Sequence, residues 1–181
     1  MIEDRERWNK KYLSEKLPEE PSEIVKNFYS LAKKGKALDI AAGTGRNSIF
    51  LHKKGFQVDA VDISDVALNI LKKKQPEINT IQADLDNFDF PLDRYEIVLN
   101  INFLNRNLIP KIKDSLKKDG VLIFETFVLN EEAKTKDFYL RKNELLHLFI
   151  DFYVVYYQEF ETKRYDGRNA LKASLAAIKK C

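Results

Sequence analysis

Two glycines and two aspartates stand at spacings that suit the binding of a nucleoside. Gly43 and Gly45 follow an apolar run within the string LDIAAGTGRNS (38–48). Glycines leave the backbone bare for a ligand, and the start of a following helix offers unpaired N–H groups. Asp62 comes 17 residues after Gly45, close to the spacing at which an acid binds ribose hydroxyls in such units. Asp84 offers a second acceptor farther along the chain, so the pattern predicts a nucleoside site.

Such residues meet if their strands are parallel, because the carboxyl ends of parallel strands share one edge of the sheet. The sequence supports this arrangement, since short apolar runs alternate with lysine-rich amphipathic segments. The predicted strands are 36–41, 56–62, 78–84, 95–102 and 120–127. The predicted helices are 22–35, 46–54, a helix that begins at the N-cap Ser64, and 108–118, whereas 85–94 is expected to be a loop.

The C-terminal part follows a different pattern. Two runs, 151–160 and 170–180, are separated by a polar segment that contains Gly167, and this predicts a hairpin. We therefore expect an α/β fold with a seven-stranded sheet. Five parallel strands come first, the antiparallel hairpin follows, and helices cover both faces.

The composition narrows the class of protein. A chain of 181 residues fits one domain. The net charge is +3 with both signs interleaved, so we expect a small-molecule partner and no nucleic acid or membrane. Cys181 is the only cysteine, which argues against an internal disulfide or a thiolate-rich metal site and fits a reducing compartment. With no apolar leader in the sequence, we expect a cytoplasmic protein that is a monomer or a homodimer.

A dinucleotide cofactor fits the sequence less well than a single nucleoside with an amino-acid tail. The third glycine of the G-x-G-x-x-G fingerprint is replaced by Ser48, where glycine would permit close packing of helix on strand. Only about 54 residues follow Phe127, too few for a separate substrate domain. An NAD-dependent reductase is therefore the less favoured reading.

The motifs resemble those of one enzyme superfamily. The string ALDIAAGTGRNSIFLHKKGFQVDAVDIS (37–64) is similar to the first two motifs of class I S-adenosylmethionine-dependent methyltransferases. YEIVLNINFL (95–104) and SLKKDGVLIFETF (115–127) resemble their fourth-strand and fifth-strand motifs. Within that superfamily the small bacterial tellurite-resistance methyltransferases are the most similar. The resemblance covers about 36–127.

The resemblance implies a Rossmann-like fold that forms a single methyltransferase domain over 1–181. In it, 1–35 would cover the cofactor site, 36–127 would form the cofactor-binding core, and 128–181 would add a helix and the hairpin. The implied cofactor is S-adenosyl-L-methionine, with S-adenosyl-L-homocysteine as its product.

The resemblance also implies roles for particular residues. Asp39 would orient the glycine loop and help to position the methionine ammonium. Asp62 would bind both ribose hydroxyls, and Asp84 would accept from the adenine amino group. The full set of implied cofactor-binding residues is Trp8, Tyr12, Asp39, Ala41, Ala42, Gly43, Thr44, Gly45, Arg46, Asn47, Asp62, Ile63, Asp84, Leu85, Asn100 and Asn102. In this set the aromatic pair Trp8 and Tyr12 would fold over the cofactor or only anchor a terminal helix. Arg46 and Asn47 would reach a ligand or only begin a helix.

Two departures from the family pattern matter. Ala41 stands where the family has its first glycine, and a residue with a Cβ there is expected to keep a negative φ. Near Asn100 the sequence reads NINF, without the prolines of the Asp/Asn-Pro-Pro-Tyr signature, so methylation of DNA bases is not expected.

No catalytic base can be assigned from the sequence. His52 and His147 are more typical of surface or packing positions. A sulfonium methyl is already activated, so positioning can suffice for a soft anionic acceptor, whereas a hydroxyl or amine would need a proton acceptor. The prediction is in-line methyl transfer to a small molecule. The alternative is a protein that binds the cofactor without turnover.

Overall fold

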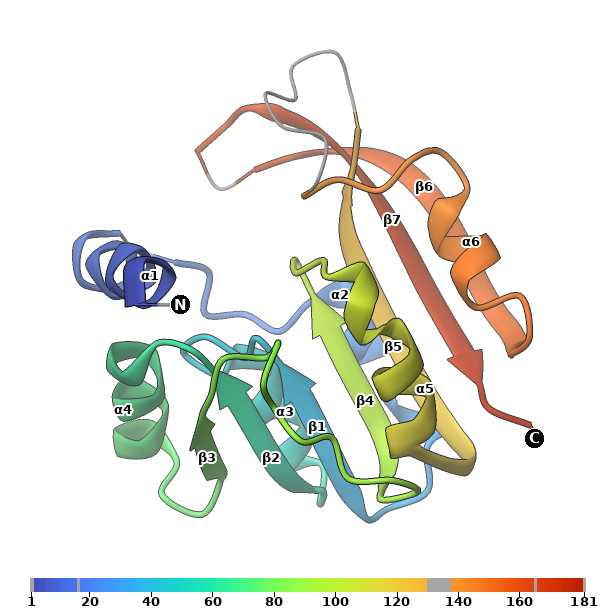
Figure 1. The fold of residues 1–181 in the computed structure, drawn as a ribbon, viewed down its shortest axis with the longest axis horizontal. Helices are drawn as coiled ribbons and strands as arrows, with labels where there is room; N and C mark the ends of the chain where they lie inside the picture. The colour runs from blue at the N-terminus through green and yellow to red at the C-terminus, as the bar shows by residue number, and fades with distance from the viewer. Residues whose placement is uncertain (1, 16, 130–137, 165, 181) are drawn as a thin grey trace.

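The computed structural model describes residues 2–15, 17–129, 138–164 and 166–180, and Cys181 lies outside them. Its centre is a seven-stranded sheet with the strand order β3-β2-β1-β4-β5-β7-β6 (Figure 1). The strands are β1 (Lys36–Ile40), β2 (Gln57–Asp62), β3 (Asn79–Gln82), β4 (Tyr95–Ile101), β5 (Leu116–Val128), β6 (Tyr153–Lys163) and β7 (Asn169–Ile178). The α-helices are α1 (Ile2–Ser14), α2 (Glu23–Phe28), α3 (Arg46–Lys53), α4 (Asp65–Lys74), α5 (Ile109–Ser115) and α6 (Glu144–Leu148). Short 3₁₀ turns are Tyr29–Leu31 and Arg106–Leu108.

The strand directions confirm the predicted sheet. β1 to β5 pair in parallel, whereas β7 lies antiparallel between β5 and β6. The carboxyl ends of β1, β2 and β4 therefore meet at one edge, and the loops that follow these strands carry the residues singled out by the sequence. Segment 85–94 has neither helix nor strand, as predicted.

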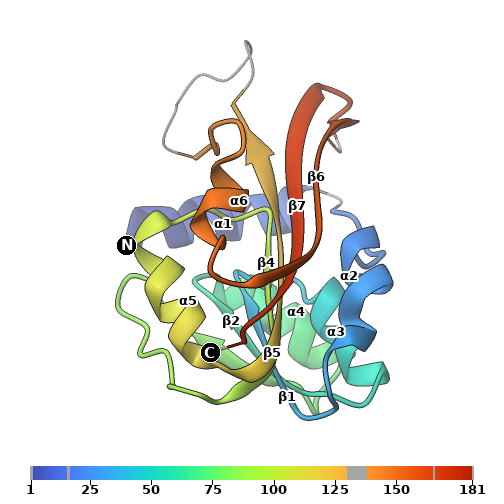
Figure 2. The ribbon, with the colours of Figure 1, turned by 90° about the vertical axis from the view of Figure 1, so that its right-hand side faces the viewer.

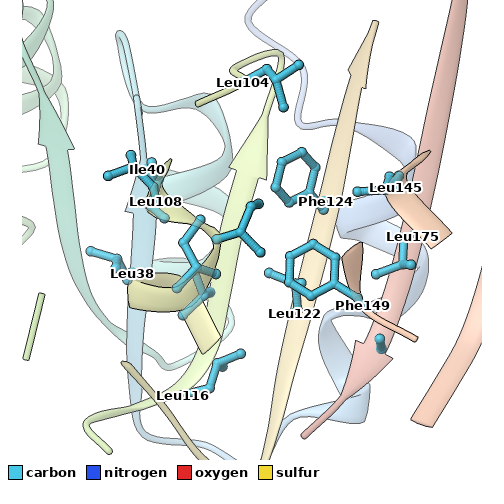
Figure 3. Close-up of a cluster of buried hydrophobic side chains, with 14 of the residues drawn as sticks. Leu38, Ile40, Leu104, Leu108, Leu116, Leu122, Phe124, Leu145, Phe149 and Leu175 are labelled. Carbon is cyan, nitrogen blue, oxygen red and sulfur yellow. The ribbon is translucent and has the colours of Figure 1, made fainter. Parts of the chain in front are cut away.

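Helices cover both faces of the sheet, which the near-continuous burial of the parallel strands requires. Figure 2 shows α5 and α6 on one face and α2 and α3 on the other. Alternate residues of β1 enter two cores: Leu38 and Ile40 join the first, and Ala37 joins the second. In the first core Phe124 of β5 and Phe149 of the α6 end lie with ring centroids 5.8 Å apart (Figure 3).

Two predicted helices are too long. The helix predicted at 108–118 ends at Ser115, because Leu116 is fully buried and already pairs with Tyr95 in the sheet. The amphipathic segment 22–35 forms only α2 and a 3₁₀ turn. In both places tertiary packing overrides a helical hydrophobic pattern. Within the described ranges, no helix is long and apolar enough to cross a membrane.

Candidate functional site

The loop between β1 and α3 holds both glycines in left-handed conformations. The φ angle is +56° at Gly43 and +78° at Gly45, which favours glycine at each position. A Cβ on Gly45 would lie 2.3 Å from Cδ1 of Leu71, so this glycine lets α4 pack against the loop. A Cβ on Gly43 would lie 2.6 Å from the Tyr12 hydroxyl. Tyr12 of α1 thus lies directly against the loop at Gly43.

The expectation of a negative φ at Ala41 is wrong, because its φ is +53°. The chain turns at the end of β1, and the next residue, Ala42, donates its N–H to the Val61 carbonyl at 3.0 Å. This bond ties the loop to β2 and holds the left-handed turn in place. At a positive φ any residue with a Cβ is strained, and alanine has the smallest side chain of these residues.

Ala41→Gly is expected to raise the free energy of unfolding by about 0.5 kcal/mol, because relief of the left-handed strain slightly exceeds the added flexibility of the unfolded chain. Ala42→Gly is the matched control at a negative φ, and it should lower stability by about 0.5 to 1 kcal/mol. Urea unfolding of both variants measures the difference. A loss of stability in Ala41→Gly as large as in Ala42→Gly would contradict the strain.

Asp39 joins β1 to α3. Its carboxylate is 2% exposed and accepts a hydrogen bond from the Ser48 hydroxyl at 2.6 Å. Burial raises the pKa of Asp39 to about 6, and the Ser48 bond and the Arg46 charge oppose the shift. Ser48, which breaks the dinucleotide fingerprint, is therefore the residue that orients this acid. The place of Ser48 in the fingerprint does not by itself predict this role.

Because the folded-state pKa of Asp39 lies above its unfolded value, the folded protein holds this proton more tightly between about pH 4 and 6. Its contribution to stability is present at low pH and is lost as the pH rises through this window. Asp39→Asn keeps an acceptor for Ser48 without the buried charge. Relative to the wild type, the variant should gain about 2 kcal/mol between pH 4 and 7. The free energy of unfolding of both proteins is measured as a function of pH. A difference between them that stays constant from pH 4 to 7 would contradict the raised pKa of Asp39.

Asp62 ends β2 and anchors two backbone segments. Its Oδ2 accepts from the Gly43 N–H at 2.7 Å, and its Oδ1 accepts from the Ser64 N–H at 2.8 Å. Burial raises the pKa of Asp62, and these backbone bonds oppose the rise. The Ile63 N–H is a third backbone donor to this carboxylate. A carboxylate has about four acceptor positions, so about one remains for a ligand hydroxyl. A ribose hydroxyl would donate to such a carboxylate.

Asp84 lies in the loop beyond β3, which ends at Gln82, two residues earlier than predicted. The loop is tied to the site because Ala83 donates its N–H to the Asp62 carbonyl at 3.0 Å. Asp84 itself is half-buried and accepts from the Asp86 N–H at 3.1 Å, and Leu85 beside it is buried. Asp84 and Leu85 thus follow the strand next to Asp62, as the nucleoside hypothesis requires.

The two asparagines at the end of β4 differ in environment. Asn100 is buried and its Nδ2 donates to the Phe103 carbonyl at 2.7 Å. Asn102 is exposed with φ +60°, and its N–H donates to the Glu125 carbonyl at 2.7 Å. Asn100 therefore shapes the turn, while the Asn102 side chain is free to face a ligand.

The N-terminal helix α1 lies beyond the carboxyl end of the sheet, next to α4 (Figure 1). The rings of Trp8 and Tyr12 are 5.9 Å apart on this helix. Burial raises the pKa of the Tyr12 hydroxyl, and the charges of Asp62 and Asp39 raise it further. Tyr12 is therefore neutral and lies within the electrostatic reach of both site acids.

Arg46 and Asn47 begin α3 and bind the segment between α1 and α2. Arg46 Nη1 donates to the Glu20 carbonyl at 3.1 Å, and Asn47 Oδ1 accepts from the Ser22 N–H at 2.9 Å. Thr44 and Ile63 are half-buried beside the two aspartate-bearing loops. The structure thus brings the glycine loop, Asp62 and Tyr12 together. Arg46 and Asn47 instead bind the backbone of the segment between α1 and α2.

A buried ion pair on β5 and β7 was missed by the sequence analysis. Glu125 Oε1 accepts from Lys172 Nζ at 2.8 Å, and Glu125 Oε2 accepts from the Ser174 hydroxyl at 2.6 Å. The Glu125 and Lys172 side chains are 11% and 15% exposed. The charge of Glu125 also reaches Arg46. A glutamate inside an apolar strand, in VLIFETF, was the available signal, but its partners lie 47 and 49 residues away.

The arrangement suits binding of a nucleoside with a cationic or zwitterionic tail more clearly than it suits acid-base chemistry. Asp39 has a pKa in the useful range, but at 2% exposure its carboxylate is enclosed. The Glu125 carboxylate is already engaged by two donors. The site offers a bare backbone at Gly43 and a remaining acceptor position at Asp62.

Comparison with known proteins agrees with this geometry. A profile described as a methyltransferase domain matches residues 37–120. The ubiquinone/menaquinone biosynthesis C-methyltransferase UbiE of Campylobacter jejuni is 30% identical over 129 residues, covering 61% of this chain and 54% of that protein. The carboxy-S-adenosyl-L-methionine synthase of Nautilia profundicola is 30% identical over 156 residues, covering 77% of this chain and 61% of that protein. The chain thus spans little more than half the length of these curated relatives.

The fold has close counterparts among solved structures. TehB from Haemophilus influenzae superposes with a TM-score of 0.78 at 20% sequence identity, over 97% of this chain and 67% of TehB. This likeness shows that the two proteins share the fold. The matched profile covers β1 to the start of β5, which is the part that carries the glycine loop and both aspartates.

Proposed function

We propose that the chain, which matches a methyltransferase-domain profile over residues 37–120 and is 30% identical to a curated C-methyltransferase over 129 residues, is a class I S-adenosylmethionine-dependent methyltransferase. In this proposal it transfers a methyl group from S-adenosylmethionine to a small-molecule acceptor by direct in-line attack. The observation that carries the proposal is the bond of 2.7 Å between Asp62 and Gly43. It joins the acid suited to a ribose to the glycine of the loop against which the Tyr12 hydroxyl lies. A bare backbone at Gly43 and a remaining acceptor position on Asp62 fit this cofactor.

In this proposal each residue has a defined task. Asp62 binds the ribose hydroxyls, Asp84 and Leu85 meet the adenine, and Asp39 orients the glycine loop near the amino-acid end. Trp8 and Tyr12 on α1 cover the cofactor and exclude water. The cofactor, when bound, supplies an activated sulfonium methyl. The protein's part is to hold an acceptor atom in line at about 3 to 3.5 Å from that carbon.

The enclosed state of Asp39 and the engaged carboxylate of Glu125 favour acceptors that need no base from the protein. Thiolates and chalcogen oxyanions arrive with a free lone pair and lose no proton on methylation. A hydroxyl or an unactivated amine would need a proton acceptor. We therefore expect soft anions to be better acceptors than alcohols of similar size.

The test is release of S-adenosylhomocysteine from S-adenosylmethionine by the purified protein, with a panel of thiols, chalcogen oxyanions, amines and small alcohols. Release that depends on an acceptor, greater for the soft anions, supports the proposal. Asp62→Asn at the same concentration should abolish it. Cofactor binding without release with any acceptor in the panel would contradict the enzymatic part and favour a cofactor-binding protein.

A further inference from the structure

Asn9 connects the N-terminal helix to the body through both ends of its amide. Its Nδ2 donates to Asp65 Oδ1 at 2.8 Å, and its Oδ1 accepts from the Ser64 hydroxyl at 2.6 Å. These partners are adjacent in sequence but lie 55 and 56 residues from Asn9. One side chain therefore fixes the position of α1 relative to the start of α4.

Ser64 carries this connection to the candidate cofactor site. Its hydroxyl accepts from the Ala67 N–H at 3.1 Å and so caps α4, while its own N–H donates to Asp62 at 2.8 Å. Asn9, Ser64 and Asp62 form a continuous chain of hydrogen bonds. One residue, Ser64, thus separates Asn9 from the acid suited to the ribose.

Among the described side chains of helix α1, none is fully buried. Residues 3–14 are all exposed or only partly buried, so no side chain among them enters a core. Docking that lacks buried apolar surface depends more on specific polar bonds. Yet α1 carries Tyr12, whose hydroxyl lies against Gly43, and Trp8 beside it.

From these contacts we infer that Asn9 is a positioning residue: it holds α1 docked so that Trp8 and Tyr12 stay over the cofactor. The inference rests on the proposed function and assigns Asn9 no contact with the cofactor. Loss of its two bonds should free α1 and speed escape of the ligand. It should leave the glycine loop and Asp62 intact.

The first test compares Asn9→Ala with Asn69→Ala, the same change at an exposed position of α4. Trp8 is the only tryptophan, so its fluorescence reports α1 directly. We expect Asn9→Ala to increase acrylamide quenching of Trp8, and to weaken S-adenosylhomocysteine binding by about 10-fold, through faster dissociation. Asn69→Ala should match the wild type in both. Unchanged quenching, unchanged affinity or tighter binding in Asn9→Ala would overturn the inference, the last because docked α1 would then compete with the ligand.

The second test reverses one hydrogen bond. Asn9→Asp places two carboxylates together and should undock α1 at least as fully as Asn9→Ala. Adding Asp65→Asn gives an amide donor to the new carboxylate, which can still accept from Ser64. The double variant should regain most of the affinity and the low quenching lost in Asn9→Asp. Asp65→Asn alone is the reference. If the double variant matches this reference in neither affinity nor Trp8 quenching, a direct role for the Asn9 bonds is contradicted.

These measurements separate this inference from the proposed function. Quenching of Trp8 without ligand tests the docking of α1 whatever the protein binds. A wild type that fails to bind S-adenosylhomocysteine contradicts the proposed function. If the wild type binds S-adenosylhomocysteine and Asn9→Ala binds it with the same affinity, only the positioning role is contradicted.

Discussion

Asp62→Asn is expected to weaken the binding of S-adenosylhomocysteine by about 100-fold. Two charge-assisted hydrogen bonds to ribose hydroxyls are each worth about 1.5 to 3 kcal/mol, and every 1.4 kcal/mol is a factor of ten. The asparagine keeps the shape of the side chain and one oxygen. It cannot accept from both the Gly43 and Ser64 N–H groups and also from a diol.

Calorimetric titration of Asp62→Asn measures this effect, with Asp114→Asn at an exposed position of α5 as the matched control. The control should bind as the wild type does. The variant should show a native circular dichroism spectrum and a modest loss of thermal stability, since one backbone N–H loses its acceptor. Affinity within about threefold of the wild type in a folded variant would contradict the assignment of Asp62 to the ribose.

Glu125→Leu is expected to lower the free energy of unfolding by about 3 to 5 kcal/mol. The change leaves the Lys172 ammonium mostly buried without its partner, and removing one member of a buried ion pair carries this cost. The Lys172 side chain is 15% exposed, so it has little access to water. Urea unfolding of the variant measures the loss.

Two further variants test the cause of that loss. Lys172→Met in the Glu125→Leu background removes the unpaired charge and should recover most of the stability. Asp151→Ala breaks the Lys113–Asp151 pair, whose side chains are 24% and 56% exposed, and should cost less than about 1 kcal/mol. A loss below about 1 kcal/mol in Glu125→Leu, or no recovery in the double variant, would show that the unpaired Lys172 charge is not the cause of the instability.

The parts of the fold that the sequence predicts well are those with strong local signals. Alternation of apolar runs and amphipathic segments located five parallel strands and the terminal hairpin. Ser64 was identified as an N-cap, and its hydroxyl does accept from the Ala67 N–H. The predicted end of a helix is wrong where a residue that fits the helical pattern pairs in the sheet instead, as Leu116 does. Periodicity records which residues are apolar, but not which neighbour buries them.

Some features of the candidate site are likewise predictable from local sequence motifs, and others are not. Gly43 and Asp62 lie in motifs read along the chain, so their approach was predictable. The positive φ of Ala41 was not, because the strain is held by a bond from Ala42 to β2. Asn9 gave no signal either: an asparagine in a charged helix is unremarkable until its partners, 55 and 56 residues away, are known. Long-range polar pairs of this kind leave no local pattern.

Every role proposed for the site depends on binding of an S-adenosyl nucleoside at the carboxyl edge of β1 and β2. Calorimetric titration of the purified protein with S-adenosylhomocysteine, with NADH in a parallel titration, tests this claim most directly. We predict saturable binding of S-adenosylhomocysteine at one site per chain and no binding of NADH. Saturable binding of NADH alone, or of neither compound by a folded protein, would contradict the account.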